Sequence, residues 1–473
     1  RQYSLERESY LVEKTYQKLT IFRHFNSIRL IISLALILAF LPFNAALAQM
    51  SIISDEETEQ YLAKVIQPIF KTAGIPFNRN KIYIVNDNSL NAFVGDGNDL
   101  FIHTGTLMKA DNTDQISGVL AHETGHIMGG HILRQKIKNQ NMQEASLASI
   151  VLAGAAAVAS GRGDVAMAVM MGSQSSMLSN YLAYRVEEER SADDAAVKLL
   201  YKQKSSPQGL LDFMKKIQRQ NTLSGIEESD YYRTHPVTGE RIRFLQQAVQ
   251  QSPYPRTTAL DNEFQRIKAK LIAFLSEPAQ TFKRYPLTDK SVPARYAQAI
   301  AYFKQLNFSQ AQKTLDALLE QEPNNPYFRE LKAQIYLEQG KIKAAKNEYA
   351  KVLELRPNAA LLQVDWAQAA LADAPSSQEL KEIIAVLNRS VQRRPSATGW
   401  MLLAQAYSQN NQPGYADYAA AEYSLRIGAI DIAKRQTNSA AKSNPPARLK
   451  LKLEDLQQRI KNLYPDSEKR RRR

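Results

Sequence analysis

The chain has 473 residues, 44% of them hydrophobic, and this length exceeds what one compact core can hold, so we expect two or three domains. It contains no cysteine, which excludes structural disulfides and thiolate metal ligands. The basic residues behind the formal charge of +14 are scattered, apart from a terminal run over Lys469–Arg473. This pattern argues against nucleic-acid binding and predicts at most an attraction to anionic membrane surfaces.

The N-terminus has the pattern of a secretory signal peptide. Arg23 and Arg29 precede an apolar run over residues 30–43, and Ala46-Leu47-Ala48 follows as an A-x-A cleavage site. We therefore predict that residues 1–48 direct export and are removed after Ala48. The alternative is an uncleaved anchor through residues 30–43, but this run is shorter than the ~20 residues of a spanning helix.

Residues 49–251 have the pattern of one α+β unit. Helical apolar spacing covers residues 55–73, and residues 81–85 have the composition of a buried strand. Apolar runs over residues 92–94 and 100–102 flank a Gly-Asp-Gly-Asn-Asp turn and predict a hairpin. The strand over residues 100–104 is then either part of the hairpin core or an edge to which an extended substrate adds.

The next predicted helix carries the most informative motif of the chain. It starts near Asp114, with Asp111 or Thr113 as its cap, and ends at Gly129-Gly130. Within it, His122-Glu123-Thr124-Gly125-His126 is an H-E-x-x-H sequence, which on a helix places both imidazoles on one face. The motif predicts one zinc ion per chain, bound by the two histidines, with Glu123 as the general base.

A hydrolytic zinc site usually has a third protein ligand and leaves the fourth position to water. Glu189 on a second predicted helix is the best candidate, with Asp193 one turn further on as the acceptor that orients a ligand histidine. Glu187 and Glu188 are close competitors. Three other histidines are predicted not to bind the metal: His24, His103 and His131.

Residues 145–182 are rich in Ala, Val, Met and Gly. Their first uninterrupted apolar stretch covers residues 147–159, which is shorter than the ~18 residues expected of a membrane span. We predict buried or membrane-touching helices here.

An internal repeat follows a predicted helical linker at residues 252–292. Tyr302, Ala311 and Pro323 recur 34 positions later as Tyr336, Ala345 and Pro357, which is the tetratricopeptide pattern. Because single repeats cannot bury their apolar faces, we predict about four stacked helical pairs over residues 293–442. A capping helix and a basic tail are expected at residues 443–473. The fold class is therefore α+β and mostly helical: a zincin-type metalloprotease domain with a small sheet, then an α-solenoid.

Taken in chain order, His122 to His126, Glu189 with Asp193, and His235 followed by Arg241 resemble the motifs of the HtpX-like zinc metallopeptidases. The export signal and the repeats narrow this likeness to the soluble BepA-like branch of the periplasm. The resemblance implies that Glu189 is the third ligand. It also implies that His235 approaches the metal as a fourth ligand or swings away, and that His235 and Arg241 are catalytic residues that stabilise the oxyanion.

The function that the resemblance implies is a periplasmic zinc endopeptidase. Its substrates would be misfolded or stalled outer-membrane β-barrel proteins, and its repeats would dock on the outer-membrane assembly machinery. One alternative is a chaperone or adaptor for the same assembly process with a latent zinc site, because a fourth ligand at His235 would displace the catalytic water. A weaker alternative is a membrane-integrated protease that uses residues 145–182 as spans.

Overall fold

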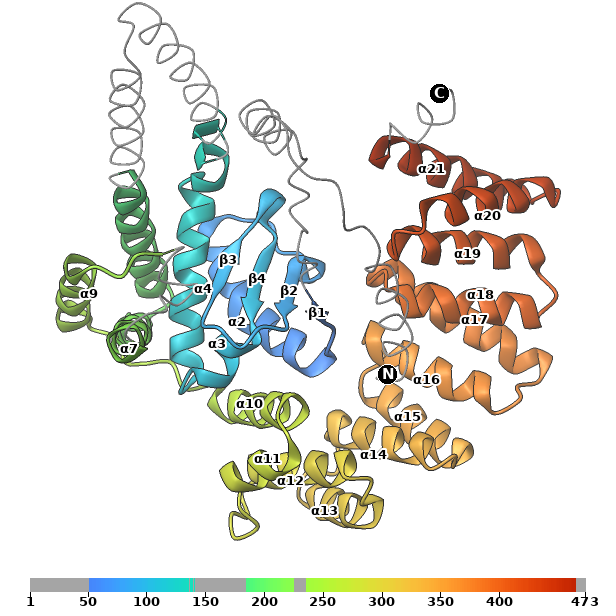
Figure 1. Ribbon diagram of the computed structural model, residues 1–473, viewed down its shortest axis with the longest axis horizontal. Coiled ribbons are helices and arrows are strands. Elements are labelled where there is room, and N and C mark those ends of the chain that lie inside the picture. The colour runs from blue at the N-terminus through green and yellow to red at the C-terminus, as the bar shows by residue number, and fades with distance from the viewer. Residues whose placement is uncertain (1–50, 136, 139, 141–183, 225–234, 465–473) are drawn as a thin grey trace, which may run out of the picture. The chain divides into compact units, whose positions relative to one another are not determined.

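The computed structural model describes residues 51–135, 137–138, 140, 184–224 and 235–464. The predicted signal peptide, the apolar segment at residues 145–182 and the basic tail from residue 465 lie outside these described residues. Within them, the predicted fold class is confirmed: the chain is mostly helical, with one small sheet in its first part and stacked helices in its second (Figure 1).

The sheet has four strands in the order β1-β2-β4-β3. Strand β2 pairs in parallel with β4, and β3 pairs antiparallel with β4. The predicted strand near residues 81–85 and the predicted hairpin are both confirmed. The strands are β1 (Ile52–Ile53), β2 (Ile82–Val85), β3 (Ala92–Val94) and β4 (Leu100–His103).

Strand β4 is an inner strand, so of the two alternatives for residues 100–104 the hairpin core is correct and the edge is wrong. Local sequence could not decide this point, because the neighbour on the far side of β4 is β2, which pairs with it from beyond the hairpin. The edge strand beside β4 is β3, and β3 lies next to helix α4 (Figure 1).

The two faces of the sheet differ in what covers them. Ile84 and Ile102 point to the face packed against α2 (Glu56–Ala73) and α4 (Thr113–Met128), and both are fully buried. On the opposite, partly exposed face, Tyr83, Phe101 and Phe93 stack in a row across β2, β4 and β3, with ring centroids 4.9 and 4.8 Å apart. The sheet thus serves as the floor on which α4 is held.

Helix α4 is capped by Asn112, and not by Asp111 or Thr113 as predicted. The side-chain oxygen of Asn112 accepts the backbone N–H of Gln115 at 3.1 Å, which is the bond that an N-cap supplies. The predicted end at Gly129 is confirmed. The shorter elements around the sheet and the two helices after it are η1 (Arg79–Lys81), η2 (Asp96–Asn98), α3 (Thr104–Lys109), α7 (Gln208–Ser224) and α9 (Gly239–Gln251).

Helix α10 (Asp261–Leu275) lies against α2, α3 and α12 and joins the two parts of the chain. Its Arg266 and Lys270 form ion pairs with Glu57 at the start of α2, at 2.6 and 3.4 Å. The helices that follow are α11 (Pro278–Arg284), α12 (Val292–Lys304), α13 (Phe308–Gln321), α14 (Pro326–Glu338), α15 (Ile342–Leu355), α16 (Ala360–Ala372), α17 (Ser377–Arg393), α18 (Ala397–Gln409), α19 (Pro413–Arg426), α20 (Ile430–Lys442) and α21 (Ala447–Leu463).

The 34-residue period corresponds to helix pairs. Ala311 in α13 and Ala345 in α15 occupy equivalent positions and are both fully buried. Successive helices from α12 to α19 pack on one another, so each pair covers the apolar face of the next (Figure 1). Alanine at these positions lets the two helices of a pair approach closely.

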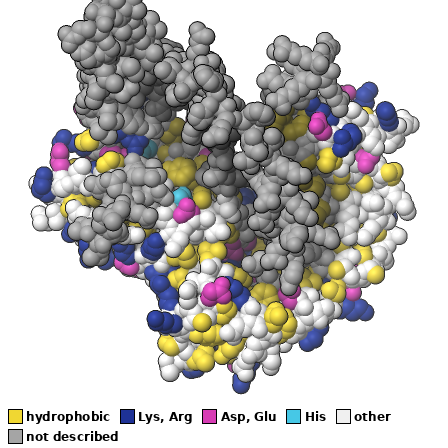
Figure 2. Space-filling view, viewed as in Figure 1, with side chains coloured by type: hydrophobic (Ala, Val, Ile, Leu, Met, Phe, Trp, Pro, Cys, Tyr) yellow, Lys and Arg dark blue, Asp and Glu magenta, His cyan; other side chains and the backbone are white. Residues whose placement is uncertain are grey.

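Lys and Arg side chains are spread among acidic, polar and apolar ones over the face seen in Figure 2, which agrees with their scattered distribution in the sequence. Among the described residues, no helix is both long and apolar enough to cross a membrane.

Candidate metal centre

Helix α4 brings two histidines together at its buried C-terminal end. The i, i+4 spacing places the Nε2 atoms of His122 and His126 3.2 Å apart. His122 is fully buried and His126 is 7% exposed, so both rings lie inside the protein. Two imidazole nitrogens this close and shielded from water can share a cation.

A second helix, which covers residues 184–202, supplies a carboxylate to the same point. Glu189 lies with Oε2 3.3 Å from Nε2 of His122 and Oε1 3.3 Å from Nε2 of His126. The two helices meet at Gly125, where an added Cβ would lie 2.6 Å from the carbonyl oxygen of Ala192. The glycine inside the motif therefore allows a backbone-to-backbone approach that a side chain would prevent.

His235 reaches the cluster from the segment before α9. Its Nδ1 lies 3.0 Å from Oε1 of Glu189 and 3.4 Å from Nε2 of His122. Together, His122, His126, Glu189 and His235 offer four buried ligand atoms that all lie within 4.8 Å of one another. We call these four residues the metal cluster.

The metal cluster fits a tetrahedral ion. Zinc bonds of ~2.0–2.1 Å in a tetrahedron would separate the ligand atoms by ~3.3 Å. The contacts between neighbouring ligand groups, from 3.0 to 3.4 Å, are close to this value, with Glu189 facing His122 through Oε2 and His126 through Oε1. The donor set of imidazoles and a carboxylate is also one that zinc accepts.

Behind the metal cluster, Asp193 and Arg241 hold the ligands in place. Nδ1 of His122 lies 2.9 Å from Oδ1 of Asp193. The guanidinium of Arg241 donates to both carboxylate oxygens of Asp193, from Nε at 2.6 Å and from Nη2 at 2.9 Å. Its Nη1 lies 2.8 Å from Glu189 and donates to the carbonyl of Pro236 at 2.8 Å. Arg241 thereby links the carboxylates behind the site to the segment that carries His235.

Glu123 has an unsatisfied carboxylate. It is 1% exposed, and neither of its carboxylate oxygens has a hydrogen-bond partner among the described residues. Nε2 of His235 lies 3.6 Å from Oε1 of Glu123. Burial raises the pKa of Glu123 above its usual value, and the positive charges of His235 and His122 only partly oppose this. A buried carboxylate without partners needs a ligand or a water beside it.

The two histidines of the motif differ in their electrostatics. Burial lowers the pKa of His122, but its bonds to Asp193 and Glu189 outweigh burial and raise this pKa to about 9. Burial dominates at His126 and lowers its pKa to about 3. Burial raises the pKa of Glu189, but the charges of His235 and Arg241 hold it well below the usual range. The carboxylate is therefore ionised, which a metal ligand requires.

All seven predicted site residues lie together in the structure, although 113 positions separate His122 from His235. Of the competing carboxylates, Glu187 is exposed and Glu188 is buried outside the metal cluster. Sequence reasoning missed one contact: His131, which is not one of the four, places its Nδ1 2.9 Å from Nδ1 of His126. The Gly129-Gly130 pair before it was the available signal, because it marks a tight turn.

His103 lies apart from the metal cluster, on β4. Its Nδ1 lies 2.8 Å from Oγ of Ser89, so this histidine is satisfied within the sheet region.

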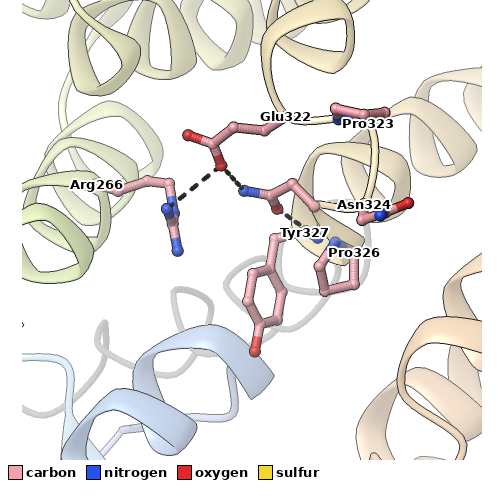
Figure 3. A pocket seen from close by; sticks show the side chains of 7 residues that line it. Arg266, Glu322, Pro323, Asn324, Pro326 and Tyr327 are labelled. Carbon is pink, nitrogen blue, oxygen red and sulfur yellow. Dashed lines mark hydrogen bonds and ion pairs between the residues drawn. The ribbon is translucent and has the colours of Figure 1, made fainter.

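A pocket elsewhere in the molecule contains no comparable chemistry. It lies where α10 meets the turn between α13 and α14, and Arg266, Glu322, Asn325 and Tyr327 line it (Figure 3). Glu322 accepts a hydrogen bond from Asn325 at 2.7 Å and lies 3.7 Å from Arg266. Its polar groups are thus engaged with one another, and the metal cluster is the better candidate for catalysis.

Comparisons with known proteins agree with this geometry. Residues 56–249 match the family model described as Peptidase family M48, and residues 296–360 match the model described as Tetratricopeptide repeat. The first range contains the whole metal cluster and Glu123, and the second covers α13, α14, α15 and most of α12.

Three relatives are similar over different lengths. The Beta-barrel assembly-enhancing protease of Escherichia coli (strain K12) is 24% identical over 398 residues, which cover 82% of this chain and 80% of that protein. The protein of the same name from Yersinia pestis is 24% identical over 366 residues, 76% and 74% of the two chains. Metalloprotease YcaL of Escherichia coli (strain K12) is 28% identical over 189 residues, 40% of this chain and 68% of that protein. These matches and the metal cluster identify the chain as a metallopeptidase with a family M48 domain followed by tetratricopeptide repeats.

Proposed function

We propose that this metallopeptidase is a zinc-dependent endopeptidase that holds one Zn²⁺ per chain through His122, His126 and Glu189. The observation that carries the proposal is the metal cluster, whose four ligand atoms lie within 4.8 Å of one another, next to a buried carboxylate without hydrogen-bond partners at Glu123. When bound, zinc would polarise the scissile carbonyl and lower the pKa of a coordinated water toward ~7.

The residues of the chain would then divide the work of peptide hydrolysis. Glu123 accepts the proton of the attacking water and returns it to the leaving amine, which is the role of a general base and then a general acid. Asp193 accepts the Nδ1–H of His122 and so keeps Nε2 of that ring available as a ligand. Arg241 positions Asp193 and Glu189, and its Nη1 stabilises the oxyanion of the tetrahedral intermediate once it turns from Glu189 toward the substrate.

We further propose that His235 controls access to the site. In the arrangement described here its Nδ1 completes the set of four ligand atoms, which would leave no coordination position for water. His235 must therefore move before cleavage can occur. In its open position the ring would be free to act on the substrate with Arg241.

The proposed substrates are unfolded or stalled outer-membrane β-barrel proteins. Two observations support this class: the name of the similar proteins from Escherichia coli and Yersinia pestis, and the edge strand β3 beside α4. Strands of an unassembled barrel are extended and have unpaired backbone groups, so they can add to such an edge by hydrogen bonding. The substrate strand would thus bind at β3 and not at β4.

The tetratricopeptide repeats would dock the protein on its partners, which we propose to be the outer-membrane assembly machinery. The compartment would be the periplasm, reached through a signal peptide at residues 1–48. Intact-mass measurement of the protein released by osmotic shock tests this point. A mature chain that begins at Gln49 supports cleavage after Ala48, whereas a membrane-bound chain that retains residues 30–43 contradicts it.

Glu123→Gln tests the enzymatic proposal. The variant keeps the size of the side chain and removes the base, so cleavage of an unfolded barrel protein should fall by ~10²–10⁴-fold while bound zinc stays unchanged. Glu187→Gln is the matched control, because Glu187 is an exposed glutamate on the helix of Glu189 and its loss should change neither quantity. If Glu123→Gln retains zinc and every cellular function of the protein, the chaperone or adaptor alternative replaces the peptidase.

A further inference from the structure

The two histidines of the motif have different partners at their second ring nitrogen. Nδ1 of His122 faces the carboxylate of Asp193 at 2.9 Å. Nδ1 of His126 faces another imidazole, Nδ1 of His131, at 2.9 Å, and the two ring planes are inclined at 77°. His131 is only 4% exposed, so this contact lies inside the protein.

The backbone after α4 is built to bring His131 back onto His126. Gly130 has φ +62°, a left-handed conformation that reverses the chain direction and favours glycine. Gly129 has ordinary helical angles, φ −72° and ψ −12°, so its own backbone would accept any residue. A Cβ at Gly129 would nevertheless lie 2.1 Å from Nε2 of His131. The space that Gly129 leaves is thus occupied by the His131 ring.

The chemistry of the contact fixes its direction. If His126 binds the metal through Nε2, its Nδ1 carries the proton and must donate it to an acceptor. The only ring atom of His131 within reach is Nδ1, which therefore accepts, and His131 carries its own proton on Nε2. One proton lies between the two Nδ1 atoms and belongs to His126.

We propose that His131 is a positioning residue of the metal site, which accepts the Nδ1–H of His126 and fixes the orientation of that ligand ring. Asp193 does the same for His122, with a carboxylate in place of the imidazole. A neutral acceptor adds no negative charge to a site that already contains Glu123, Glu189 and Asp193. This inference rests on the proposed zinc site.

Zinc affinity of the purified full-length protein is the primary measurement, made by competition with a chromogenic chelator. His131→Ala removes the acceptor and should weaken zinc binding by ~10–100-fold. His131→Asn should stay close to wild type, because the asparagine Oδ1 can replace the histidine Nδ1 as acceptor. Cobalt substitution supplies a second readout, since the visible absorption of Co²⁺ should change in His131→Ala and be restored in His131→Asn.

Gly129→Ala gives an independent test in which His131 itself is not substituted. The new methyl group displaces His131, so zinc affinity should fall nearly as far as in His131→Ala. In the His131→Ala background, Gly129→Ala should have little further effect, because the group that it displaces is already absent. His103→Asn is the matched control: His103 is also buried and bonded through Nδ1, but it lies on β4 apart from the metal cluster, and zinc affinity should not change.

Three outcomes would overturn the inference. Zinc affinity that is equal in wild type and His131→Ala would leave His131 with a packing role only. A His131→Asn protein as weak as His131→Ala would show that an acceptor at this point is not what matters. Additive effects of Gly129→Ala and His131→Ala would separate the turn from the ring. If the wild-type protein itself binds no zinc, the proposed function fails instead, and the two failures are thereby distinguished.

Discussion

The two parts of the chain use buried volume in opposite ways. At the end of α4, the interior is filled with polar and charged side chains, among them Glu123, Asp193 and Arg241, each no more than 3% exposed. In the repeats, the interior between α12 and α14 is made of apolar residues such as Leu315 and Phe328. Stability in the repeats is spread over many similar contacts, whereas the metal site depends on a few charges that must all be compensated. Mutations should therefore have different consequences in the two parts.

The largest expected effects come from two histidines of the metal cluster, and they should have opposite signs. His122→Ala removes a proposed ligand and leaves Asp193 and Glu189 without their partner, so bound zinc and cleavage should fall to background. His235→Ala removes the proposed fourth ligand, so zinc should remain. Cleavage should rise, because the freed position for water should outweigh the loss of the ring's action on the substrate. Metal analysis and a cleavage assay on both proteins test this.

Helical content measured by circular dichroism serves as the control for both variants, and it should stay unchanged because α12 to α21 do not depend on the site. A His235→Ala protein without zinc would contradict the gating role and make His235 an obligatory ligand.

A core substitution in the repeats should show the reverse pattern. Leu315 in α13 is fully buried within an apolar cluster, so Leu315→Ala should lower the free energy of unfolding by ~2–5 kcal/mol through lost burial and the cavity left behind. Zinc affinity of the folded protein should match wild type. Chemical denaturation and chelator competition measure the two quantities. Weaker zinc binding in Leu315→Ala would mean that the parts are coupled more tightly than their separate cores suggest.

The smallest expected effect is a pH dependence from Asp114, which lies in the first turn of α4. Burial raises the pKa of Asp114 to about 6, against the opposing bonds from Thr257 and Arg256. The folded protein therefore favours the protonated form more than the unfolded chain does, with its pKa of 3.8. This contribution to stability is complete below pH ~4 and is lost as the pH rises through ~6.

Asp114→Asn should remove that dependence. Relative to wild type, the variant should gain about 1–3 kcal/mol of unfolding free energy between pH 4 and pH 7. Urea unfolding of both proteins at the two pH values gives the difference, in which histidine protonation and metal release cancel. Parallel curves for the two proteins would contradict the shifted pKa.

Sequence patterns predicted best what local spacing decides. The helix of residues 55–73, the hairpin around Phe93 and Phe101, and the 34-residue repeat all follow from periods of a few residues, and all are present. The order of the strands was not predictable in this way, because the neighbour of β4 comes from β2, outside the hairpin.

The metal site divides along the same line. The spacing within the motif indicates that His122 and His126 share a face, and helical periodicity suggests Glu189 with Asp193. His235 belongs to the site only through a contact across 113 positions, for which the family resemblance was the sole guide. The contact of His131 with His126 depends on a left-handed turn at Gly130, which spacing alone does not express.

The close crossing at Gly125 limits how this site can change. Since the backbone of the helix over residues 184–202 nearly touches α4 there, the distance from Glu189 to the motif histidines is set by main chain and not by adjustable side-chain packing. A glutamate spans that distance, an aspartate at the same position would stop short, and a bulkier residue at 125 would move the whole helix away. An engineer who transplanted the five-residue motif to another scaffold would therefore need to carry the crossing with it, because the third ligand is a property of the pair of helices.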